Sequence, residues 1–254
     1  MNFQNKVVLI TGASTGIGKE LSIILSKRNC KLILIARRIE LLDGLVSKIS
    51  HNSNSEFLTL KCDVSKKEEV TEAYKKSIDK FGKIDIAILN AGFAENMKAE
   101  EYNSELAETT FGTNVFGMIY WVEQLLPEFI KRRNGFIVGI SSLADNRGFS
   151  GSGFYCASKA AASVYLEGLR VELAEFNIKI ITVKPGFVKT PMTDKNDFYM
   201  PFIMEATKAA DIIIKGIEKE KRIIQFPFAV VFVTKLVGFL PGKIYEFFAK
   251  KKIL

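Results

Sequence analysis

Short apolar runs alternate with longer segments along most of the chain. Runs rich in Val, Ile and Leu span residues 6–11, 31–36, 56–62, 85–90, 135–140 and 179–184, with a seventh candidate at 222–226. Continuous apolar runs of this length are typical of parallel strands that are buried on both faces. The intervening segments, such as 66–81 and 153–176, are long enough for crossover helices. The alternation therefore predicts a doubly wound α/β fold built on a parallel sheet.

The chain reads as one domain followed by an unusual C-terminal segment. Its 254 residues are 48% apolar, enough to fill one sizeable core, and no long linker or repeat divides them. We expect a nucleotide-binding and catalytic domain over residues 1–226 and an apolar, basic extension over 227–254. The N-terminus enters a strand without an apolar leader, so we expect a cytoplasmic protein.

Cysteine and histidine are too scarce for several kinds of site. The three cysteines, Cys30, Cys62 and Cys156, show no C-x-x-C spacing, and His51 is the single histidine. We therefore expect reduced thiols, no metal site and no catalytic triad through histidine.

A glycine-rich turn, T-G-A-S-T-G-I-G, follows the first apolar run. Ligands of parallel sheets bind beyond the carboxyl ends of the strands, where glycines let the backbone approach a pyrophosphate and a helix start offers free N–H groups. A merely tight strand-to-helix turn is the alternative. The position after the first strand favours a dinucleotide site that includes Gly12, Ser14, Thr15, Gly16, Ile17 and Gly18.

Arg37 and Arg38 end the second apolar run, where an NAD site usually places an acidic residue for the ribose hydroxyls. A guanidinium pairs well with the 2′-phosphate that distinguishes NADP. Two solvated surface arginines are the alternative. We expect NADP(H) as the cofactor.

Tyr155 and Lys159 lie four residues apart, so they share one face of a predicted helix. A phenol has a pKa of about 10, and an ammonium about 4.5 Å away contributes ~3.7 kcal/mol at an effective dielectric near 20. We expect this charge to lower the pKa of Tyr155, which then exchanges a proton with a substrate oxygen. Y-x-x-x-K alone is common, so its neighbours matter. Ser142, or alternatively Ser141, ends the fifth strand and can hydrogen-bond the same oxygen.

With these motifs together, the chain resembles the classical short-chain dehydrogenases/reductases over about residues 6–190, which implies a Rossmann fold. The matching features are T-G-x-x-x-G-x-G at 11–18, an aspartate after the third strand, N-A-G after the fourth, T-N-V-F-G at 113–117, the Ser, Tyr and Lys set, and P-G-F-V-K-T at 185–190. The residue before N-A-G departs from the family pattern, because Leu89 stands where an asparagine is usual.

The resemblance implies a role for each matching residue. It selects Ser142 over Ser141 and makes Asn114, Ser142, Tyr155 and Lys159 the catalytic set, with Asn114 holding a water in a proton relay. Lys159 would also bind the nicotinamide ribose. The remaining cofactor contacts would be Asp63 and Val64 at the adenine, Val188 and Thr190 at the nicotinamide amide, and Asn90, Ala91, Gly92, Pro185 and Gly186 along the cleft. The family also implies a homodimer or homotetramer.

The segment from Lys221 onward carries seven Lys or Arg residues and one Glu, which is +6 of the chain's net charge of +8. No stripe of charge accompanies a nucleic-acid reading element, so we expect no nucleic-acid partner. The apolar stretch 226–240 is too short and too interrupted to span a membrane. Packing against the core or a second subunit is one reading. A peripheral membrane contact is the other, with Phe247, Phe248 and Lys250, Lys251 and Lys252 as its expected contact residues.

The segment after Thr190 contains six large apolar residues between 198 and 204. They fit either an apolar pocket wall or packing within a lid. We predict an NADP(H)-dependent oxidoreductase that interconverts a ketone or aldehyde and an alcohol on a lipophilic compound. The alternatives are a 3-oxoacyl-type reductase of fatty-acid metabolism and a non-catalytic NADP-binding regulator.

Overall fold

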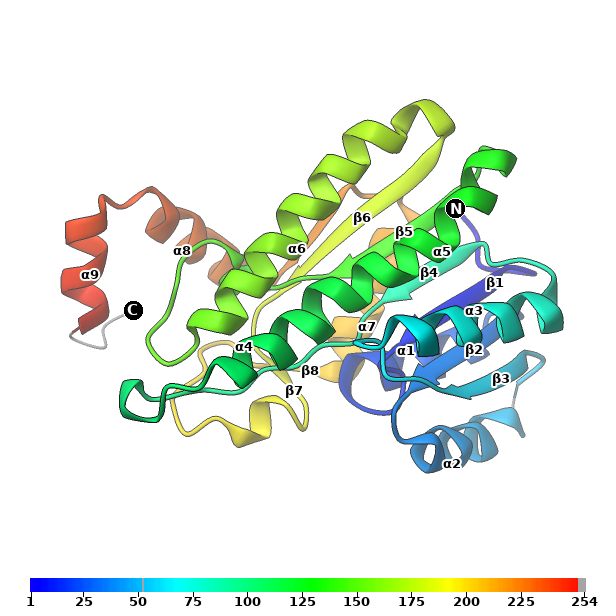
Figure 1. Ribbon diagram of the computed structural model, residues 1–254, viewed down its shortest axis with the longest axis horizontal. Coiled ribbons are helices and arrows are strands. Elements are labelled where there is room, and N and C mark those ends of the chain that lie inside the picture. Colours follow the sequence, from blue (N-terminus) through cyan, green and yellow to red (C-terminus); the bar gives the residue numbers. More distant parts are fainter. Residues whose placement is uncertain (52, 251–254) are drawn as a thin grey trace.

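A parallel sheet of seven strands forms the centre of the molecule, with helices on both faces (Figure 1). The structure, a computed structural model, describes residues 1–51 and 53–250. Across the sheet the order is β3-β2-β1-β4-β5-β6-β9, and every neighbouring pair is parallel. This confirms the predicted doubly wound α/β fold. The strands are β1 (Val7–Thr11), β2 (Lys31–Ala36), β3 (Glu56–Lys61), β4 (Ile86–Leu89), β5 (Gly135–Ile140), β6 (Ile178–Pro185) and β9 (Ile223–Phe226).

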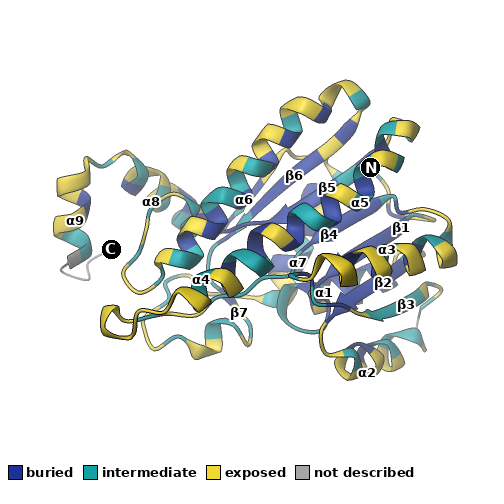
Figure 2. Ribbon diagram, viewed as in Figure 1, coloured by how far each residue is buried: buried dark blue, intermediate teal, exposed yellow. Residues whose placement is uncertain are grey.

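Two apolar clusters hold the helices against the sheet. On one face, α1 (Gly16–Ser26), α2 (Ile39–Ser50) and α7 (Ala206–Glu218) contribute buried residues such as Leu21, Leu42 and Ile213. On the other face lie α3 (Lys67–Phe81), α5 (Gly117–Arg132) and α6 (Gly153–Glu172), with Trp121 and Leu166 in the cluster. Figure 2 shows buried strands between helices whose outer faces are exposed. Apolar burial of this kind is the main stabilising contribution to such a fold.

One strand differs from its prediction. The run at 56–62 was expected to be buried on both faces, but none of the residues of β3 is fully buried. The reason is its place in the sheet, because β3 is an edge strand that pairs only with β2.

The topology places the motifs at one edge of the sheet. β1 pairs with β2 on one side and with β4 on the other, so the chain reverses its direction across the sheet at this point. A crevice forms at such a switch point, beyond the carboxyl ends of the strands. The segments that follow β1, β2, β4, β5 and β6 all open onto this edge.

The C-terminal extension forms two helices, α8 (Phe228–Phe239) and α9 (Gly242–Lys250), which follow β9. Val231 and Val237 of α8 are buried, whereas five other large apolar residues of the helix are exposed, and four of these form a stripe. This stripe, called the α8 stripe below, consists of Phe228, Phe232, Leu236 and Phe239. Among the described residues, no helix is long and apolar enough to cross a membrane.

Arg147, in the loop after β5, fastens both C-terminal helices to that loop. Its guanidinium donates to the carbonyls of Val237, Gly238 and Leu240 at the end of α8, and it lies 5.2 Å from the ring centre of Tyr245 in α9. The Tyr245 hydroxyl donates to the carbonyl of Gly148 at 2.6 Å. A cation at the carboxyl end of a helix also interacts favourably with the helix dipole. The extension therefore packs on the loop between β5 and α6.

Candidate active site

A cleft of about 250 Å³ lies at the carboxyl edge of the sheet and collects most of the residues predicted from the sequence. Two predicted residues, Gly18 and Asn114, do not line it and are described below. The predicted residues that line it are Gly12, Ser14, Thr15, Gly16, Ile17, Arg37, Arg38, Asp63, Val64, Asn90, Ala91, Gly92, Ser142, Tyr155, Lys159, Pro185, Gly186, Val188 and Thr190.

The glycine-rich turn has a backbone that other residues would strain. Gly12 and Gly16 have φ angles of 64° and 56°, in the left-handed region that favours glycine. A Cβ at Gly18 would lie 2.3 Å from the carbonyl oxygen of Gly12. The third glycine therefore lets α1 start close against the turn, and the first turn of α1 points its N–H groups toward the cleft edge.

Thr11 and Asn90 join the turn to the end of β4. The Thr11 hydroxyl accepts from the backbone N–H of Asn90 at 2.9 Å and from that of Ala91 at 3.0 Å. The Asn90 side chain donates to the carbonyls of Thr11 and Gly12 at 3.0 and 3.2 Å. Asn90 thus fixes the turn from the side. The part played by Thr11 was not predicted, because its only signal in the sequence is a hydroxyl at the last position of β1.

Lys159 is buried in the centre of the site. Its Nζ donates to the carbonyl of Ile140 at 3.0 Å and lies 5.7 Å from the ring centre of Tyr155. Burial lowers the pKa of Lys159 from 10.5 to about 8, and the negative charge of Asp145 opposes that change. Removing an ammonium from water disfavours its charged form, which explains the direction.

Burial also has the largest effect on the pKa of Tyr155, in the direction opposite to our expectation. It raises the pKa of the phenol above its ordinary value, while a hydrogen bond with Ser142 lowers it and Cys156 and Asp145 raise it further. The expected decrease is therefore wrong for the protein alone, because removing the phenolate from water outweighs the favourable interactions. Tyr155 is protonated at neutral pH.

The two serines at the end of β5 have different partners. The Ser141 hydroxyl donates to the Lys159 carbonyl at 2.9 Å and meets the Ser163 hydroxyl at 2.8 Å. Ser142 begins a 3-10 turn (Leu143–Asp145) and is the serine that hydrogen-bonds Tyr155. Ser142 is therefore the serine beside the phenol, and its catalytic role remains a prediction.

Asn114 lies behind the cleft wall in a π-helical turn (Gly112–Phe116) between α4 (Ser104–Phe111) and α5. Its amide nitrogen donates to the Phe93 carbonyl and the Ser158 hydroxyl, both at 2.9 Å, and its oxygen accepts from the Phe93 N–H at 2.7 Å. Both N–H donors of the amide are used within the protein. The side chain joins the segment after β4 to α6, and the expected water relay remains a prediction.

Two segments at the cleft are exposed. Arg37 and Arg38 leave the end of β2 with exposed side chains. The segment after Thr190 has apolar side chains open to solvent, with Tyr199 87% and Phe202 63% exposed. Among the described residues, no group of three His, Cys, Asp or Glu side chains is arranged to hold a metal ion.

Comparison with known proteins places the chain in a family. The family model described as short chain dehydrogenase matches residues 6–198. The chain therefore belongs to the short-chain dehydrogenase family. Within that family it is an oxidoreductase with a Rossmann-type sheet.

Individual relatives cover nearly the whole chain. An uncharacterized oxidoreductase of Myxococcus xanthus is 31% identical over 246 residues, 97% of each chain. Among solved structures, a short-chain dehydrogenase from Sphingobium yanoikuyae in complex with NADPH is 25% identical, with a TM-score of 0.82 over 91% of both chains. A family member from Burkholderia phymatum in complex with NAD shares the fold, with a TM-score of 0.84 at 22% identity over 93% of this chain and 94% of that one.

The buried lysine generates a prediction about stability. We expect Lys159→Met to raise the free energy of unfolding at pH 7 by about 1 to 3 kcal/mol, because it removes a buried charge. In the wild-type protein the folded pKa of about 8 lies below the ordinary 10.5. The unfolded chain therefore binds more protons between these values, and this lysine makes stability rise with pH across that window. Denaturant unfolding from pH 7 to 10, without cofactor, measures both effects.

Lys75→Met, on the exposed side of α3, is the matched control and should leave the wild-type pH dependence unchanged. If Lys159→Met were less stable than wild type at pH 7, or showed the same rise with pH, the argument from burial would be wrong.

Proposed function

We propose that this protein is an NADP(H)-dependent reductase that converts a ketone or aldehyde group of a lipophilic compound into an alcohol. The observation that carries the proposal is the meeting of Ser142, Tyr155 and Lys159 in one cleft that also reaches Arg37. The same cleft thus offers an acid, an ammonium and a guanidinium to one extended ligand.

The residues present fit a nicotinamide dinucleotide. Gly12, Gly16 and Gly18 leave room where side chains would fill the turn, and the start of α1 offers N–H groups to a pyrophosphate. Gly92 lines the cleft near Lys159, whose Nζ would lie 3.6 Å from an added Cβ. When bound, the cofactor supplies a hydride to the carbonyl carbon.

The protein's own residues handle the proton. In the proposed reduction Tyr155 donates its phenolic proton to the carbonyl oxygen, which becomes the alcohol hydroxyl. The Ser142 hydroxyl donates a hydrogen bond to the same oxygen as negative charge develops on it. Burial of Tyr155 supports the direction, because a raised pKa keeps the phenol protonated and ready to donate. Lys159 orients the cofactor, and its ammonium stabilises the phenolate that remains on Tyr155 after the proton has been donated.

The cofactor and substrate preferences rest on two exposed groups. Arg37 and Arg38 stand where an acidic residue would favour NAD, which supports NADP(H). The first residues after Thr190 line the cleft, and farther along the same segment Phe198, Phe202 and Ile203 are exposed, which supports a lipophilic substrate. Exposed apolar side chains close together are typical of surfaces that receive an apolar partner.

The proposal extends to where the enzyme acts and how it assembles. We place it in the cytoplasm, held reversibly at membranes by the C-terminal extension. Of the residues expected at this contact, Phe247 of α9 is 54% exposed and Phe248 is partly buried. The α8 stripe adds exposed apolar side chains, with Lys235 exposed on α8 and Lys243 on α9. Lys251 and Lys252, expected at this contact, lie outside the described residues, as does the side chain of Lys250. A homodimer or homotetramer, measurable by sedimentation velocity, completes the proposal.

For the chemistry, we expect Tyr155→Phe to abolish NADPH oxidation, by at least about 100-fold, in a screen of lipophilic ketones and aldehydes. NADPH binding should stay within about threefold of wild type, because only the proton donor is removed. Stopped-flow absorbance measures turnover and fluorescence titration measures binding. Near-normal turnover in the phenylalanine variant would overturn the assignment of the acid.

For cofactor choice, we expect Arg37→Ala to weaken NADPH binding about tenfold or more relative to NADH binding. Only NADPH carries the phosphate with which this guanidinium would form charge-assisted hydrogen bonds. Fluorescence titrations with both dinucleotides measure the ratio. Equal losses for the two would reject this role, and Arg38→Ala would then be the next variant to measure.

For membrane contact, we expect binding to anionic phospholipid vesicles that weakens with salt and is lower for neutral vesicles. Phe228→Ser combined with Phe239→Ser should remove most of it, because these side chains are 84% and 88% exposed. Tyr102→Ser, 70% exposed in the loop before α4, is the matched control. Wild-type protein that fails to sediment with vesicles at low salt would leave core or subunit packing as the function of the extension.

A further inference from the structure

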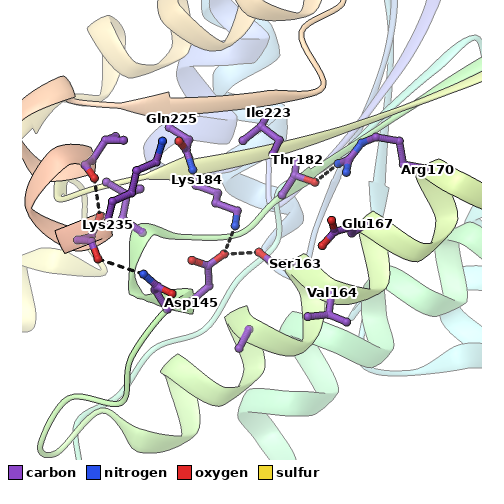
Figure 3. A pocket seen from close by; sticks show the side chains of 15 residues that line it. Asp145, Ser163, Val164, Glu167, Arg170, Thr182, Lys184, Ile223, Gln225 and Lys235 are labelled. Carbon is purple, nitrogen blue, oxygen red and sulfur yellow. Dashed lines mark hydrogen bonds and ion pairs between the residues drawn. The ribbon is translucent and has the colours of Figure 1, made fainter. Parts of the chain in front are cut away.

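One buried carboxylate outside the cofactor cleft contacts the elements that carry the active-site residues. Asp145 is the last residue of the 3-10 turn that Ser142 begins, and its side chain is 7% exposed. It lines a second cavity of about 290 Å³ between α6, β6, β9 and α8. Figure 3 shows Asp145 in this cavity, between Lys184 and Ser163.

Asp145 has one partner on each neighbouring element. Lys184 of β6 places its Nζ 2.6 Å from the Asp145 carboxylate, and the lysine side chain is only 20% exposed. Ser163 of α6, one helical turn beyond Lys159, contacts the same carboxylate oxygen through its hydroxyl. The carboxylate thus ties the 3-10 turn to both β6 and α6. An ion pair this far from solvent is held more firmly than an exposed one, and losing one partner is costly.

The contacts continue to the main chain of the catalytic helix. The hydroxyls of Ser163 and Ser141 lie 2.8 Å apart, and Ser141 donates to the carbonyl of Lys159. On the other side, the 3-10 turn is closed by the Ser142 hydroxyl, which accepts from the Ala144 N–H at 3.1 Å. Ser163 has one hydroxyl proton, which it donates either to Asp145 or to Ser141. In both cases these contacts link the turn that carries Ser142 to the helix that carries Tyr155 and Lys159.

We propose that Asp145, paired with Lys184, is a positioning residue for the reaction, which holds Ser142 against Tyr155 and sets the electrostatic environment of the phenol. The proposal deepens the proposed function, on which it rests for its effect on turnover. Asp145 does not touch the reacting atoms and acts through Ser142, Ser163 and the charge that it brings near α6.

The charges of Asp145 and Lys184 predict the direction in which the pKa of Tyr155 changes, which packing alone would not predict. The groups around Tyr155 are Lys159 and Cys156 on its own helix, and Asp145 with Lys184 behind the 3-10 turn. Arg147 and Tyr245 pair with each other farther along the loop. The charge of Asp145 raises the pKa of both Tyr155 and Lys159. Lys184 compensates that charge. Removing the charge of Asp145 should therefore lower the pKa of Tyr155, and removing the charge of Lys184 should raise it.

The experiment compares three single variants, each of which neutralises one charge at the second cavity. We expect Asp145→Asn to move the titration midpoint of Tyr155 to lower pH by about 0.5 to 1, and Lys184→Gln to move it to higher pH by a similar amount. Glu167→Gln, on another wall of the same cavity, is the matched control and should move it little. ¹³C NMR of protein labelled at the tyrosine ring carbon that bears the hydroxyl follows the midpoint, with Tyr155→Phe assigning the signal.

Turnover gives the second readout. With a carbonyl that the wild-type enzyme reduces, we expect Asp145→Asn to lower kcat about tenfold while the KM for NADPH stays within about twofold, because the catalytic groups shift and the cofactor turn does not. Shifts of the same sign in Asp145→Asn and Lys184→Gln, or none in either, would overturn the proposal. If Asp145→Asn does not fold, the sign for Lys184→Gln against Glu167→Gln still decides it. A wild-type protein that reduces no carbonyl would refute the proposed function, while the NMR midpoints would still test the electrostatic part.

Discussion

The ammonium of Lys159 is held in the protein interior by the last carbonyl of β5, and the arrangement of the site depends on this contact. The contact needs α6 to lie close against the sheet. Gly139 permits this, since a Cβ there would come within 2.4 Å of the Leu166 side chain. With the helix at this distance, Tyr155 falls beside Ser142 and the same burial that disfavours the ammonium also keeps the phenol protonated. Packing and acid–base chemistry therefore have a common origin.

Much of the sheet and cleft could be predicted from the sequence, because strands buried on both faces leave continuous apolar runs and parallel strands bring their carboxyl ends to one edge. Gly12 and Asn90 follow from such a position, whereas Tyr155 follows from its four-residue spacing to Lys159 on a helix. The partial exposure of β3 could not be predicted, since an edge strand and a central strand can have the same amino-acid composition. The pair of Asp145 and Lys184 was equally out of reach, because two charges far apart in sequence give no signal until β5 and β6 are paired.

The C-terminal extension illustrates how a shared fold acquires individual character. A fold of this kind hosts many activities, and differences reside in the segments attached to it. Here Asn146 donates to the Thr234 carbonyl at 3.0 Å, and Arg147 binds the end of α8. Both side chains come from the loop that joins Ser142 to the helix of Tyr155. The position of α8 and α9 is thus tied to a wall of the active site through the loop between β5 and α6.

The π-helical turn at Gly112–Phe116 has a mechanical consequence of its own. It lies within a continuous helical stretch between α4 and α5, and such turns correspond to one additional residue in an α-helix. Each residue of an α-helix advances the rotation by about 100°. The turn takes up that rotation locally, so the face of α5 where Trp121 and Phe129 meet the sheet keeps its orientation while the extra residue is accommodated beside Asn114. Loss of one residue here would leave a regular α-helix and the same buried face on α5, but it would change the backbone that places Asn114 between Phe93 and Ser158.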